Sequence, residues 1–255
     1  MKSNEFEDQT KQYFFELIDH LYSNGGDFEK CRNDALAAAE RAGIPEYEMK
    51  EHMVVKWTER ALDALSDGVL TNTEEDNLAG ILSAFGLDSF GAIDGDLIRR
   101  MTKLAIIRDL KDGKVESRIP LKVTVPFKMQ KSETLLWRAE NVTLKEVVKK
   151  RQIKGQSLGF SFRVAKGVYV RPSAFSAATE ETESLQVTDR GDVFLTNKHL
   201  YFNGGDKNFR IRLTAFATIE PYSDGLELQK NTQTARPFFL LGLDGWFFYN
   251  VIQAV

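Results

Sequence analysis

Three carboxylates in the stretch DALSDGVLTNTE, residues 63–74, have the spacing of a calcium-binding loop. Asp63, Asp67 and Glu74 fall at the first, fifth and twelfth places of an EF-hand loop, and a glycine stands at the sixth place, where the loop turns sharply. The third place holds a leucine, which has no oxygen to offer a cation. The spacing predicts a divalent-metal site at these carboxylates. The alternative is a helix end, a turn and a second helix capped by Thr71 and Glu74.

A basic cluster lies in KKRQIKGQ, where a strand pattern changes to a loop pattern: Lys149, Lys150, Arg151 and Lys154. Each basic residue near an anionic membrane contributes about 1 kcal/mol of attraction, so four residues on one face would bind acidic lipid headgroups or an acidic protein. No aromatic or apolar prong accompanies the cluster. A solvated loop, or a dock for the acidic first half of the chain, is therefore the alternative interpretation.

Two further cations alternate with apolar residues in the stretch FRIRL. Arg210 and Arg212 are separated by Ile211, so a strand here would place both arginines on its solvent face. They are candidates for contacting an acidic partner. A polar outer face is also what any half-buried strand shows.

Motifs of known enzyme classes are missing from the sequence. There is no glycine-rich phosphate loop, no G-x-S-x-G and no paired-carboxylate motif, so we expect a non-enzymatic protein. His20, His52 and His199 are scattered singly without a second ligand at zinc-like spacing. Cys31 stands alone in a helical pattern. We expect no cofactor other than the divalent cation considered above.

The charge of the chain is divided unevenly along its 255 residues. Residues 1–112 contain 13 Lys and Arg against 23 Asp and Glu, and residues 113–255 contain 21 against 14. With pI ≈ 5.8 and aromatics that alternate into the predicted core, the chain is not expected to bind nucleic acid. The polar N-terminus and the lack of a long apolar run predict a cytoplasmic protein, peripheral to the inner face of the membrane if it binds lipid.

The first half has the apolar periodicity of helices separated by short turns. The expected helices cover residues 6–21, 28–41, from Pro45 to about residue 65, 71–87 and 95–110. After Lys114 the pattern alternates, as in strands. Strands are expected at residues 121–127, 134–142, 157–164, 167–172, 192–196, 199–202, 209–213 and 226–228, with an exposed loop at 173–188 and a C-terminal helix from about residue 244. The fold class expected is α+β, an all-α bundle followed by an antiparallel β-barrel or sandwich capped by a C-terminal helix.

The second half resembles a bacterial pleckstrin-homology-like (PH-like) domain of the GRAM type. The resemblance covers roughly residues 120–255 and includes the stretch GFSFRVAKGVYVRPSAF, residues 159–175. It implies a barrel that recognises a protein or a phosphoinositide-containing membrane. The residues that carry it are Leu195, Thr196, Asn197, Lys198, Leu200, Tyr201, Phe202, Lys207, Arg210 and Ile211.

The first half resembles a tellurite-resistance TerB-type helical domain, through ALDALSDGVLTNTEEDNLAGILSAFGLD, residues 61–88. That resemblance implies a helical bundle associated with bacterial stress or phage-defence systems. We therefore expect a TerB-like bundle at residues 1–112 and a PH-like domain at 113–255. Together they would form an adaptor that holds a protein partner or an anionic membrane surface. The alternative is a divalent-metal-responsive helical domain tethered through the PH-like domain.

Overall fold

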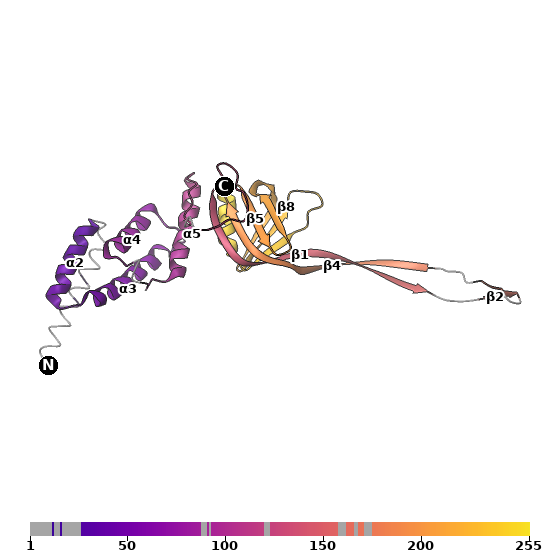
Figure 1. Ribbon diagram of the computed structural model, residues 1–255, viewed down its shortest axis with the longest axis horizontal. Coiled ribbons are helices and arrows are strands. Elements are labelled where there is room, and N and C mark those ends of the chain that lie inside the picture. Colours follow the sequence, from indigo (N-terminus) through magenta and orange to yellow (C-terminus); the bar gives the residue numbers. More distant parts are fainter. Residues whose placement is uncertain are drawn as a thin grey trace, which may run out of the picture. The chain divides into compact units, whose positions relative to one another are not determined.

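The computed structural model describes residues 12, 16, 27–87, 91, 93–119, 123–157, 162–165, 168–170 and 175–255, and for residues 149–182 it describes the backbone alone. The chain divides into two compact units, and the division falls between Arg118 and Ile119. The first unit is helical and the second is built on a sheet (Figure 1). The helix expected at residues 6–21 lies outside the described residues, apart from two positions assigned to helix.

The described part of the helical unit contains α2 (Phe28–Ala42), α3 (Glu46–Ala64), α4 (Asn72–Phe85) and α5 (Gly95–Lys111), as the periodicity predicts. Side chains cap three of these helices. Asp27 accepts hydrogen bonds from the first turn of α2, Asp94 does so at α5, and Thr71 and Glu74 form a reciprocal capping box at α4. Glycines in the left-handed conformation end α2 at Gly43 and α4 at Gly86. The boundaries of these helices are therefore encoded locally.

The core of the helical unit surrounds Trp57, which is completely buried. Its indole N–H donates to the carbonyl oxygen of Leu78 at 2.9 Å, which ties α3 to α4 and satisfies the only polar atom of the ring. Apolar side chains at helical spacing on α3 complete this face, among them Met49, Met53 and Ala61.

The second unit is a seven-stranded antiparallel sheet followed by a C-terminal helix of 10 residues. The strand order is β6-β5-β4-β1-β9-β8-β7, and α6 (Gly245–Ala254) packs against the sheet, where the rings of Phe247 and Trp137 lie 5.0 Å apart. This arrangement confirms the predicted α+β fold with a PH-like second half. The strands are β1 (Leu135–Ser157), β4 (Phe175–Thr196), β5 (His199–Gly204), β6 (Asn208–Arg212), β7 (Phe216–Tyr222), β8 (Gly225–Lys230) and β9 (Phe238–Leu241).

Strands β1 and β4 are far longer than their neighbours and continue beyond the rest of the sheet as a two-stranded ribbon (Figure 1). Strand β9 pairs with β1 only at Thr143–Glu146, and β5 pairs with β4 only at Gly191–Leu195. From Val147↔Leu185 to Ser157↔Phe175, β1 and β4 therefore pair with each other alone within the described part of the chain. A short hairpin, β2 (Phe162–Ala165) with β3 (Val168–Val170), lies between them in sequence.

Two sequence predictions are wrong in this region. The exposed loop expected at residues 173–188 is strand from Phe175 onward, because its backbone pairs residue by residue with β1. The strand expected at 121–127 is not formed at residues 123–127, which run along the sheet without joining its hydrogen-bond ladder. Among the helices that the structure describes, none combines the length and the hydropathy needed to cross a membrane.

Candidate functional site

A buried carboxylate organises one corner of the β unit. Glu133 precedes β1, its side chain has no exposed surface, and Oε1 accepts from Thr196 Oγ1 at 2.7 Å and from the Tyr201 hydroxyl at 2.9 Å. His199 Nδ1 lies 2.9 Å from the same oxygen, and Oε2 accepts from the backbone N–H of Gln130 at 2.8 Å. The Glu133 carboxylate thus connects the segment just before β1 with Thr196 at the end of β4 and with His199 and Tyr201 of β5.

The hydrogen bonds decide the charge of this carboxylate. Burial alone would raise the pKa of Glu133, but the donors from Gln130, Thr196, His199 and Tyr201 outweigh it and lower the pKa to about 2. Glu133 is therefore ionised at neutral pH and can only accept. The proton between it and His199 consequently belongs to Nδ1 of the histidine.

The Glu133 network holds His199 and Tyr201, the two β5 residues that lie opposite the predicted arginines of β6. Strands β5 and β6 pair in the register His199↔Arg212 and Tyr201↔Arg210, and residues opposite each other in an antiparallel pair share one face of the sheet. On β6, Arg210 and Arg212 are exposed and Ile211 is buried between them, which confirms the predicted alternation. Burial and the Glu133 carboxylate raise the pKa of Tyr201, and the guanidinium of Arg210 opposes that rise.

Each of the two arginines borders its own hollow, together with a lysine from another segment. A hollow of about 330 Å³ is lined by Arg212, Lys198 and the buried His199, with Leu213 and Ile252 as apolar wall. The larger hollow, of about 550 Å³, has the following polar and aromatic lining: Lys128, Arg210, Asn203, Asn208, Phe127, Tyr201, Phe202 and Phe209. We call four cations the β6 basic face: the exposed Lys128, Arg210 and Arg212 and the half-buried Lys198.

The segment before β1 forms part of this face. Phe127 stacks on Tyr201 with ring centroids 3.7 Å apart and planes within 6°, and its edge meets Phe194. Val123, Val125 and Met129 pack around the same residues. The alternation that predicted a strand at 121–127 thus arises because every second side chain is apolar and faces the sheet. Lys128, between Phe127 and Met129, lines the larger hollow.

The basic cluster at Lys149, Lys150, Arg151 and Lys154 lies within strand β1 and not in a loop, which corrects the predicted setting. The register places Lys149 opposite Glu183 and Arg151 opposite Glu181. The side chains of these four cations lie outside the described part of the structure. The pairing nevertheless shows that glutamates lie opposite Lys149 and Arg151, while Lys150 lies opposite Thr182 and Lys154 opposite Ala178.

The structure gives the three predicted metal ligands separate local roles. Asp63 lies on α3 and pairs with Arg60 at 3.9 Å, Asp67 accepts from the backbone N–H of Val69 at 2.8 Å, and Glu74 is engaged in the capping box with Thr71. No group of three or more possible ligands is found among the described residues. The helix, turn and capped helix named as the alternative are all present.

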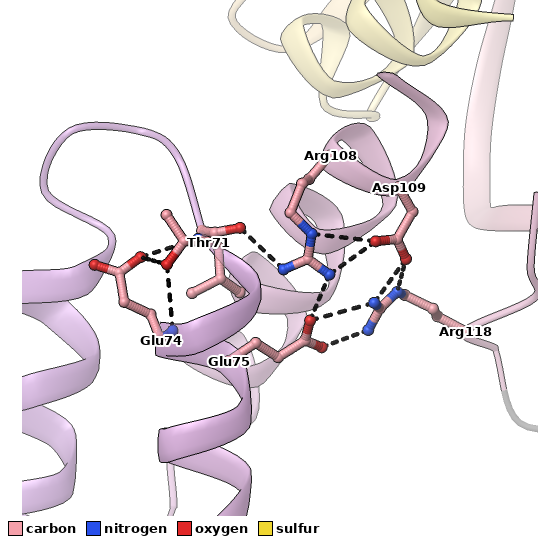
Figure 2. Close-up of polar contacts among 7 residues, drawn as sticks. Thr71, Glu74, Glu75, Arg108, Asp109 and Arg118 are labelled. Carbon is pink, nitrogen blue, oxygen red and sulfur yellow. Dashed lines mark hydrogen bonds and ion pairs between the residues drawn. The ribbon is translucent and has the colours of Figure 1, made fainter. Parts of the chain in front are cut away.

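The helical unit has its own cluster of charges, which the sequence reasoning missed (Figure 2). The guanidinium of Arg108 contacts Glu75 Oε2 at 2.6 Å and Asp109 Oδ1 at 2.8 Å. Arg118 reaches the same two carboxylates, with an ion pair to Glu75 and a contact to Asp109 Oδ2 at 2.6 Å. Arg108 also donates to the carbonyl oxygen of Leu70 at 3.0 Å. The cluster fastens the segment after α5 back onto α4 and α5.

Opposing effects set the charge of Asp109. Burial would raise its pKa, but hydrogen bonds from Arg108 and Arg118 lower it below the usual range. For both arginines, burial opposes the charged form and the carboxylates more than compensate, so their pKa values are raised. Asp109, Arg108 and Arg118 are therefore charged at neutral pH, and two carboxylates face two guanidinium groups in the cluster. Such a closed, balanced set is typical of a structural cluster.

Comparisons with known proteins add little to this description. No family model matches the chain, and no curated protein matches it either, so the TerB-type resemblance of the helical half stays a prediction. Among solved structures, the chain is similar to a crystal structure of the N-terminally truncated linker-DH/PH domains of p115-RhoGEF. The identity is 9% and the TM-score 0.23, and the match covers 100% of this chain and 71% of that chain. The PH-like assignment rests on the strand order and C-terminal helix described above.

Proposed function

We propose that the chain is a non-enzymatic binding protein whose PH-like unit holds an acidic, extended protein segment along strand β6. The observation that carries the proposal is the placement of Arg210 and Arg212 on the exposed side of β6, each at a hollow that a lysine also borders. In the bacterial setting that the resemblances imply, such a protein would serve as an adaptor in a stress or phage-defence pathway.

Strand β6 is suited to this role because it stands at one edge of the sheet. It pairs with β5 on one side and with no second strand among the described residues, so its other edge offers backbone groups to an added strand. Acidic side chains at every second position of that strand would meet Arg210 and Arg212, which are also two residues apart. The Glu133 network holds His199 and Tyr201 of β5 on the same face of the sheet as these arginines, and a preformed face reduces the cost of binding.

Fluorescence anisotropy with a labelled alternating Glu–Val octapeptide tests the proposal. We expect saturable binding that weakens with added salt, because the contact between exposed charges is screened. The double variant Arg210→Glu, Arg212→Glu should bind at least tenfold more weakly. A matched control, Arg190→Glu with Arg236→Glu, reverses two exposed charges elsewhere on the same unit and should bind as the wild type does.

Equal loss of affinity in both double variants would mean that net charge alone attracts the peptide, and would contradict the proposal. A Lys–Val peptide of the same length that bound equally well would contradict it too. If the β6 variant kept its peptide affinity but lost affinity for vesicles containing phosphatidylglycerol, the β6 basic face would be a membrane contact instead.

A further inference from the structure

The smaller of the two hollows beside β6 has a buried histidine in its wall. His199 is 3% exposed, and its Nδ1 lies 2.9 Å from Oε1 of Glu133, a buried residue outside the lining of the hollow. The polar ring atom of His199 that can meet a ligand in the hollow is therefore Nε2. Because the proton between the two side chains belongs to Nδ1, Nε2 of the neutral ring accepts a hydrogen bond. The hollow thus offers an acceptor to an N–H group.

Two cations lie at the same hollow, and neither pairs with a carboxylate in the described part of the chain. Arg212 is exposed at the end of β6. Lys198 is half-buried, and its Nζ donates to the carbonyl oxygen of Lys131 at 3.3 Å and to Ser132 Oγ at 3.0 Å, two neutral acceptors that leave its charge unbalanced. A carboxylate on the ligand would balance both cations. The hollow therefore suits a ligand with a carboxylate and, close to it, a hydrogen-bond donor.

The rest of the wall includes apolar side chains from the end of the sheet and from α6. Leu213 directly follows β6 and Ile252 lies on α6, and both are buried. A volume of about 330 Å³ is near the lower limit for ligand pockets. It suits a single aliphatic side chain with its carboxylate better than it suits a large ligand.

We propose that the smaller hollow binds the C-terminal residue of a partner protein. The last residue of a chain has a free carboxylate, a backbone N–H and a side chain on one α-carbon, and recognition of that carboxylate is an established mode of peptide binding. The carboxylate meets Arg212 and Lys198, and the N–H donates to His199 Nε2. An aliphatic side chain packs on Leu213 and Ile252.

A free amino acid shares most of this chemistry. Its amino group, however, is a charged ammonium, which would add a third positive charge beside Arg212 and Lys198. The backbone N–H of a peptide is uncharged and donates to the histidine without that repulsion. The charges at the hollow therefore favour the end of a chain over a free amino acid.

This binding mode deepens the proposed function and rests on it for the course of the partner segment. Strand β6 ends at Arg212, and the 3-10 turn Leu213–Ala215 follows. A segment that lies parallel to β6 therefore reaches the smaller hollow with its C-terminal end. Acidic residues before that end meet Arg210. The site would select the tail of a partner and not an internal stretch.

The Glu–Val octapeptide, labelled at its N-terminus and ending in valine, tests the selection for a chain end. We expect the free C-terminal acid to bind about tenfold more tightly than the C-terminal amide, because the amide loses charge-assisted hydrogen bonds. The control is the amide with one further glutamate at its N-terminal end. It has the net charge of the free acid and should bind as the shorter amide does.

Two arginine variants separate this hollow from the rest of β6. Arg212→Gln should remove the preference for the free acid. Arg210→Gln should weaken the binding of both peptides and keep the preference. Arg210 is the matched control because it is exposed on the same strand and borders the other hollow.

The contact with His199 is tested by NMR. The chain has three histidines, so the imidazole nitrogen signals of His199 can be followed. The Nε2 signal should shift when the free-acid peptide is added. A peptide whose last amide nitrogen is methylated has no hydrogen to donate, so it should bind more weakly and leave the signal in place.

The possible failures are distinguishable. Equal affinities for acid and amide, both weakened in the Arg210→Glu, Arg212→Glu variant, would overturn the chain-end assignment and leave the proposed function standing. If neither peptide bound, both proposals would fail. A His199 signal that did not move at saturation would also overturn the chain-end assignment. Displacement of the peptide by an equal concentration of free valine, or of inorganic phosphate, would assign the hollow to that ligand instead.

Discussion

At the scale of single residues, Glu133 couples the stability of the β unit to pH. Its folded pKa of about 2 lies below the ordinary value of 4.5, so the ionised form stabilises the folded β unit by roughly 3 kcal/mol. That contribution is complete above the unfolded pKa and disappears as the pH falls through about 4 toward 2.

Glu133→Gln should therefore destabilise the β unit by about 3 kcal/mol at pH 7, because an amide places N–H groups among donors that need an acceptor. The difference from wild type should shrink as the pH falls below 4. Urea denaturation at several pH values, followed by fluorescence with Trp57 replaced by Phe, measures it. Glu140→Gln changes a carboxylate that is 61% exposed in the same unit and should have little effect; equal losses in the two variants would contradict the argument.

At the scale of elements, the charge cluster joins α4, α5 and the segment that leaves the helical unit. Arg118→Ala would leave Glu75 and Asp109 with one guanidinium between them, at side-chain exposures of 24% and 11%. We expect a loss of about 1–3 kcal/mol in the unfolding free energy of the helical unit. Urea denaturation followed through Trp57 fluorescence measures it.

Arg99→Ala is the matched control for that variant. Arg99 is on α5, is 63% exposed and pairs with Asp96 at 3.6 Å, so its loss should cost well under 1 kcal/mol. If both variants lost the same stability, the cluster would contribute no more than an ordinary surface ion pair. The stabilisation by the charge cluster depends on pH through Asp109. Because the pKa of Asp109 is lowered in the folded unit, this stabilisation is present at neutral pH and is lost on acidification.

Elements were predictable from sequence where their signals are local. Asp27, the Thr71–Glu74 box and Gly86 mark helix ends within a few residues, and α2 to α5 were predicted with nearly correct bounds. The first part of β4 was not predicted, because the small and polar residues at 175–188 are typical of loops, whereas its end at 192–196 was expected as a strand. What makes this segment a strand is the pairing partner about 20 to 40 residues earlier, and local composition does not encode that partner.

The candidate site was predictable only in part for the same reason. Alternation in FRIRL correctly placed Arg210 and Arg212 on the exposed face. Glu133 lies 63 to 68 residues before its partners, and Glu75 lies 43 residues before Arg118, so neither cluster has a sequence spacing to recognise. The available signal for the first was polar residues at Thr196, His199 and Tyr201 within strands that are otherwise apolar.

At the scale of the whole molecule, the two units should respond to mutation independently. The core around Trp57 contains residues of the helical unit alone, and the sheet of the second unit is buried against its own helix α6. Contiguous structures of this kind open as separate cooperative units. Arg118→Ala should therefore speed amide exchange in α3 and α4 while leaving β4 and β5 unchanged, and Glu133→Gln should do the reverse.

Hydrogen exchange measured by mass spectrometry in moderate urea checks this independence. Coincident changes in both units for either variant would show that they unfold as one body. Separate changes would allow the peptide and vesicle measurements to be interpreted without concern for the stability of the other unit.

The long β1–β4 ribbon also has a mechanical consequence. Beyond Val147 of β1 and Leu185 of β4, both strands of the ribbon leave the seven-stranded sheet in the same direction. A force that pulls the far end of the ribbon away from the sheet is therefore carried by two covalent backbones together. The cross-strand hydrogen bonds then lie across the load and are not peeled open one after another. The ribbon would therefore act as a stiff tether under tension. The pairing of Thr143–Glu146 with β9, which holds the ribbon to the sheet, should break before the ribbon itself opens.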